Sequence, residues 1–125
     1  MLTTNTLLNF PVLTSAYTDT YRGVYVDGTY NGLAFTDYMI EFYADSSPDP
    51  SGHGEGRTWL GAFWGTTDGA GLLTIRVATG NWQPIAVGTK ISATATNTGT
   101  GDTSEFSLNI TAQYGALIVT TVNDT

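Results

Sequence analysis

Apolar and polar residues alternate with a period of two in short runs along this chain, without helical periodicity. Successive side chains of a β-strand point to opposite faces of a sheet, so this alternation predicts half-buried strands. The clearest run is Asp37–Ala44, in which Tyr38, Ile40 and Phe42 share one face. The segments predicted as strands are 11–16, 22–29, 37–44, 58–67, 72–79, 90–96 and 104–111.

Turn residues separate these segments at intervals of about 8 to 12 residues, and this spacing is typical of a β-sandwich. The seven segments predict an all-β fold, an immunoglobulin-like antiparallel Greek-key sandwich of about seven strands. Their inward-facing apolar positions predict the core. These positions are Val24, Val26, Ile40, Phe42, Leu60, Leu73, Ile75, Val77, Ile91, Ala93, Phe106 and Leu108.

The 125 residues suffice for one domain with one core. We expect a linker over residues 1–8 and the sandwich module over 9–112. The last segment, 113–125, is either a C-terminal strand or the start of a following module. The strand count is already complete at Ala112, which favours the second interpretation of the apolar stretch Ala116–Val122.

Charged residues are scarce and mostly acidic: four basic residues stand against eleven acidic ones, for a net charge of −7. Nucleic-acid binding needs the opposite sign and is not expected. Cysteine is absent, which excludes disulfides, zinc–thiolate sites and a cysteine nucleophile. No apolar run approaches the roughly 18 residues of a membrane-spanning helix. Threonine, serine, asparagine and glycine supply the polarity, so we expect a secreted or cell-surface protein without membrane insertion.

A loop rich in glycine and proline, 45–56, interrupts the strand pattern, and long loops of this kind are often functional. Asp45, Asp49 and Glu55, together with backbone carbonyls, offer the oxygen ligands that Ca²⁺ prefers. The loop does not match the EF-hand pattern. The alternative is that Asp49 caps its own turn and Glu55 accepts backbone N–H groups. Both interpretations stay open, and no other cofactor is expected.

Tryptophan side chains suggest a second kind of site, because exposed flat rings stack on sugars. The candidates for carbohydrate binding are Trp59, Trp64 and Trp82. Trp59 and Trp64 differ in parity, so a regular strand would place them on opposite faces, with one of them in the core. The alternative is that these rings serve packing or shield an interface with a neighbouring module.

Catalytic motifs are not evident. The single histidine, His53, lies in the glycine-rich loop, and no G-x-S-x-G motif is present. Glu41, Glu55 and Glu105 are the only glutamates, and nothing in their spacing selects the carboxylate pair of a glycosidase. We therefore do not expect an enzyme.

Several segments, taken together in order and spacing, resemble a known module. They are 9–16, 40–44, 49–56, 58–61, 67–71, 91–96 and 103–107. The arrangement is similar to the immunoglobulin-like module found beside right-handed parallel β-helix (CSLREA-type) segments in large bacterial secreted or surface proteins. The resemblance covers roughly Leu7 to Ile110, and residues 117–125 are similar to the first strand of such a β-helix segment. Many members carry two cysteines, for which the resemblance implies a bridge, at places where this chain has Pro48 and residues around Leu108.

The resemblance implies a non-catalytic structural or interaction module, a spacer or cap between β-helical segments that could also be adhesin-like. Its expected partners are the neighbouring domains of the same chain, with surface glycans or proteins as further candidates. A carbohydrate-binding module, or a sandwich stabilised by calcium, is the alternative.

Overall fold

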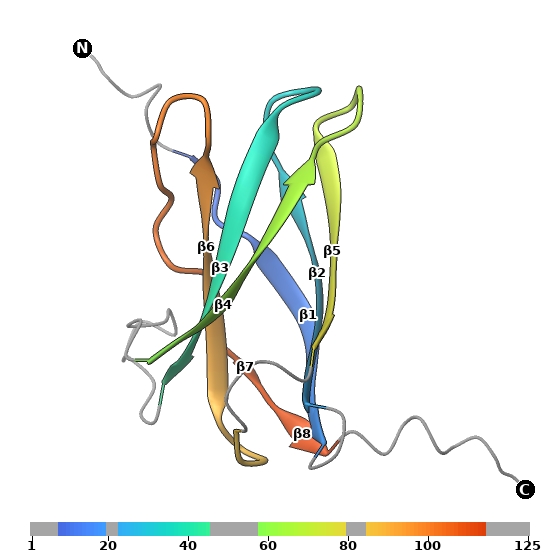
Figure 1. Cartoon of the computed structure of the whole chain (residues 1–125), viewed down its shortest axis with the longest axis vertical. Coiled ribbons are helices and arrows are strands. Elements are labelled where there is room, and N and C mark those ends of the chain that lie inside the picture. The colour runs from blue at the N-terminus through green and yellow to red at the C-terminus, as the bar shows by residue number, and fades with distance from the viewer. Residues whose placement is uncertain (1–7, 20–22, 46–57, 80–84, 115–125) are drawn as a thin grey trace, which may run out of the picture.

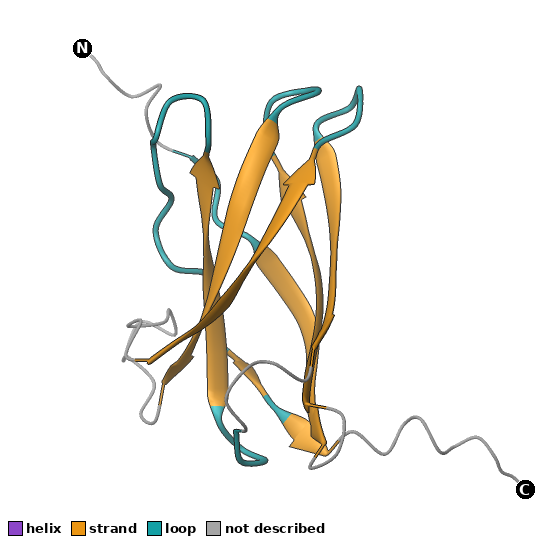
Figure 2. Ribbon diagram, in the orientation of Figure 1, coloured by secondary structure: helices purple, strands orange, loops and turns teal. Residues whose placement is uncertain are grey.

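The computed structural model describes residues 8–19, 23–45, 58–79 and 85–114, and every structural statement concerns these residues. The strands are β1 (Val12–Asp19), β2 (Gly23–Asn31), β3 (Asp37–Asp45), β4 (Thr58–Thr66), β5 (Leu72–Thr79), β6 (Lys90–Asn97), β7 (Ile110–Thr111) and β8 (Gln113–Tyr114). They form two sheets in the orders β5-β2-β1-β8 and β4-β3-β6-β7, which lie face to face (Figures 1 and 2). No helix in the described part of the chain could cross a membrane.

The two short strands β7 and β8 are separated only by Ala112 but belong to different sheets, since β7 pairs with β6 and β8 pairs with β1. The chain changes sheet four times, between β2 and β3, β4 and β5, β5 and β6, and β7 and β8. The predicted immunoglobulin-like Greek-key sandwich is thereby confirmed. Within the described residues the one parallel pairing joins β8 to β1, at Tyr17↔Gln113 and Thr18↔Tyr114.

The core lies between the sheets and contains most of the apolar positions that alternation predicts. The predicted residues found buried are Val24, Val26, Ile40, Phe42, Leu60, Leu73, Ile75, Ile91 and Ala93. Val77 is half-buried against this cluster. Two predicted core positions are wrong: Leu108 is 53% exposed, and Phe106 packs edge-on against Tyr43, with ring centroids 5.2 Å apart.

These two errors arise because the segment from 104 to 109 follows β6 without forming a regular strand. Ser107 donates its N–H to the Ala93 carbonyl, and the Ser107 hydroxyl accepts the Ala93 N–H, at 2.8 and 2.9 Å. Ser104 makes the same reciprocal pair with Ala95. Since side-chain hydroxyls replace backbone carbonyls at this edge, the two-residue alternation of a strand does not apply there.

Candidate functional site

An irregularity in β4 decides which way its side chains face. Gly61 pairs with Phe42, whereas Trp59 pairs with Tyr43, so Leu60 is an extra residue without a partner in β3. A one-residue bulge of this kind shifts the alternation of the strand that contains it. Leu60 itself turns inward and is 5% exposed.

The bulge brings two tryptophans to the same face of the sheet. Trp59 is 55% exposed and Trp64 is 65% exposed. Trp59 pairs with Tyr43 and Trp64 with Met39, two residues that share the outer face of β3. The expectation that the two indoles lie on opposite faces, one of them in the core, is therefore wrong.

The outer face of β3 and β4 forms a surface that we call the aromatic platform. It consists of Met39, Glu41 and Tyr43 of β3 and Trp59, Ala62 and Trp64 of β4. β4 is an edge strand of its sheet (Figure 1). The partners of the two tryptophans are four residues apart on β3, which corresponds to about 13 Å along the strand. Ala62 lies between the two indoles, opposite Glu41.

Glu41 fixes one of the two indoles. The Trp59 Nε1–H donates to Glu41 Oε2 at 2.9 Å. The indole N–H is the ring's sole hydrogen-bond donor, so this contact holds one edge of a side chain that stays 55% exposed. Beside it, burial and, second, the Glu41 carboxylate raise the pKa of Tyr43, which keeps this phenol protonated.

Polar groups surround the second indole. An open hollow of about 410 Å³ lies beside Trp64 and is lined also by Asp37, Tyr38, Gly65, Thr66 and Thr98. The Thr66 hydroxyl donates to Asp37 Oδ1 at 2.5 Å. The Trp64 end of the platform therefore combines an exposed ring with hydroxyl and carboxylate groups.

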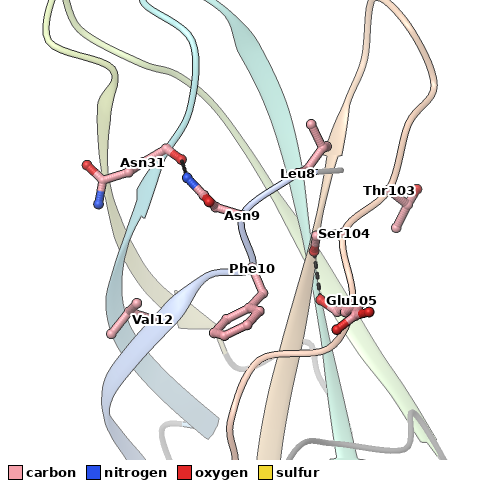
Figure 3. Close-up of a pocket in the computed structure, with 8 residues that line it drawn as sticks. All are labelled: Leu8, Asn9, Phe10, Val12, Asn31, Thr103, Ser104 and Glu105. Carbon is pink, nitrogen blue, oxygen red and sulfur yellow. Dashed lines mark hydrogen bonds between the residues drawn. The ribbon is translucent and has the colours of Figure 1, made fainter. Parts of the chain in front are cut away.

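A different hollow, of about 450 Å³, opens at the side of the sandwich between the start of β1 and residues 103–105. Figure 3 shows Leu8, Asn9, Phe10 and Val12 on one side of it and Thr103, Ser104 and Glu105 on the other. Asn9 Nδ2 donates to the Asn31 carbonyl at 2.8 Å and ties the first residues to β2. Glu105 is the single titratable group among the described residues that line this hollow, so its walls present no acid–base pair.

Asp45, one of the predicted calcium ligands, lies fully buried at the end of β3. The Ser92 hydroxyl donates to Asp45 Oδ2 at 3.2 Å. Asp49 and Glu55, the other two predicted ligands, lie outside the described residues, as does Trp82. Within the described ranges no group of three or more potential metal ligands occurs. Calcium binding by the 45–56 loop stays a prediction.

Sequence reasoning did not find the shared face of the two tryptophans or the role of Glu41. One signal was present: Gly61 lies inside a strand pattern, and a glycine there often marks a bulge. The contact between Glu41 and Trp59 depends on the pairing of β3 with β4, which follows from the fold and not from sequence spacing.

No protein-family model matches this chain, and no curated protein matches it either.

Proposed function

We propose that this chain is a non-catalytic binding module of a larger secreted or cell-surface protein and that it binds carbohydrate on the aromatic platform. The observation that carries the proposal is the exposure of Trp59 and Trp64 on one face of the sheet. Large apolar rings that gather on a surface mark interaction sites. A sugar ring presents an apolar C–H face to an indole and hydroxyl groups to nearby carboxylates, and the platform offers both kinds of partner.

The arrangement of carboxylates favours binding over hydrolysis. Glycosidases place two carboxyl groups about 5 to 9.5 Å apart across the scissile bond. Glu41 is the one carboxylate of the platform, and the next acid on this face of β3, Asp37, is four residues away, about 13 Å along the strand. Asp37 also accepts a hydrogen bond from Thr66. The platform can therefore hold a sugar chain without a second acid to cleave it.

The expected setting of the module, between β-helical segments of a bacterial surface protein, stays a prediction. A spacer role and glycan binding are compatible, because the platform occupies one sheet face and leaves both ends of the sandwich for neighbouring domains.

Titration calorimetry with a panel of oligosaccharides tests the proposal. Trp59→Ala and Trp64→Ala should each weaken binding about tenfold or more, which corresponds to about 1.4 kcal/mol. Phe35→Ala is the matched control, because Phe35 is 77% exposed and lies outside the platform. It should leave the affinity unchanged. Absence of binding by the wild-type chain to every sugar, or full binding by the double tryptophan variant, would refute the function.

A further inference from the structure

We infer that Glu41 makes the platform selective for uncharged sugar chains and positions Trp59 to stack on them. This inference rests on the proposed function and adds the class of ligand and the residue that selects it. It is carried by three features: the contact of Glu41 with Trp59, the charge of the platform, and the spacing of the two indoles.

The first feature is the hydrogen bond from Trp59 Nε1 to Glu41 Oε2, at 2.9 Å. An exposed indole on an edge strand would otherwise sample several rotamers, and each of them would have to be given up on binding. The carboxylate restrains the ring before the ligand arrives. A carboxylate accepts several hydrogen bonds, so Glu41 retains capacity for a sugar hydroxyl while it holds the indole.

The second feature is the absence of a basic side chain among the platform residues. Of the basic side chains that the structure describes, Arg76 lies on the other sheet, 3.6 Å from Asp27. Lys90 begins β6 opposite Asp45, two residues beyond the pair of Ser92 with Tyr43, and its Nζ donates to the Thr111 hydroxyl at 2.7 Å. The charge at the centre of the platform is therefore that of Glu41. A uronate or sulfate group placed there would meet a like charge, and such repulsion is an effective means of rejecting a ligand.

The third feature is the distance between the two indoles. At about 13 Å along the strand, the rings are too far apart to stack on one pyranose. The small side chain of Ala62 leaves the space between them open, with Glu41 opposite. A chain of several sugar units lying along β4 would stack at both ends and pass Glu41 in the middle, which makes the charge of its central units decisive.

The test compares neutral hexasaccharides with matched anionic ones. Cellohexaose, mannohexaose and β-galactohexaose would each be titrated into the protein. The same three hexasaccharides, oxidised to the carboxylate at C6, would be titrated in parallel. The wild-type chain should bind the preferred neutral hexasaccharide about tenfold more tightly than its oxidised counterpart. In Glu41→Gln the amide oxygen can still accept the Trp59 N–H, so tryptophan emission should stay the same while the neutral-to-anionic ratio falls about fivefold or more.

Glu105→Gln provides the matched control, since it removes one negative charge at the side hollow away from the platform and should leave the ratio unchanged. Glu41→Ala removes both functions of the residue, so it should shift tryptophan emission and weaken binding of the neutral chain. An unchanged ratio in Glu41→Gln, or equal wild-type affinity for both chains, would overturn the inference and leave the proposed function standing. Absence of binding to any of the six chains, neutral or oxidised, would refute both.

Discussion

Phe42 lies in the middle of β3 with no exposed surface. We predict that Phe42→Ala lowers the free energy of unfolding by about 3–5 kcal/mol, because it removes buried apolar surface and leaves a cavity. Chemical denaturation followed by fluorescence would measure the loss. Phe35→Ala, at a position 77% exposed, should change the stability little. An unchanged denaturation midpoint for Phe42→Ala would remove this residue from the core.

The alternation of apolar and polar residues predicted correctly which side chains of the strands lie in the core. Ile40, Phe42 and Ile75 are fully buried, as their inward positions in the alternating runs indicate. The alternation could not predict that Glu41 accepts a hydrogen bond from an indole. In the sequence, Glu41 is only a charged residue at an outward position of a strand, where charged residues are common.

The hydroxyls of Ser104 and Ser107 accept backbone N–H groups along the edge of β6. Ser107→Ala would leave the buried Ala93 N–H without its acceptor, so we predict a loss of about 1–3 kcal/mol in stability. Hydrogen exchange should report faster exchange at Ala93 in particular. Ser15→Ala, which removes a more accessible hydroxyl bonded to Asp27, is the control and should cost less. Equal exchange at Ala93 in wild type and Ser107→Ala would contradict this role of the serine.

The first six strands follow the predicted segments closely, and Leu72–Thr79 has the predicted bounds. Each of them alternates because one face meets the core. The bulge at Leu60 and the serine-bonded segment after Thr103 escaped prediction for a common reason. Both depend on how one strand pairs with its neighbour, and pairing is set by the whole sandwich.

All eight described strands of the two sheets lie at or before Tyr114. We predict that deletion of residues 116–125 leaves the thermal midpoint nearly unchanged, whereas deletion from Gln113 onward lowers it, because β8 pairs with β1. Differential scanning calorimetry would measure both. A drop of more than about 10 °C for the shorter deletion, well over 1 kcal/mol for a domain of this size, would show that the segment is an integral part of the domain.

The parallel pairing of β1 with β8 has a consequence for mechanical load. A module pulled through the residues before Val12 and after Tyr114 would have these two strands drawn in opposite directions along their length, so the force would shear the bonds between them. That contact consists of two residue pairs, Tyr17↔Gln113 and Thr18↔Tyr114. Under such tension the domain would therefore begin to open at this corner of the sandwich, on the sheet that does not contain Trp59 and Trp64.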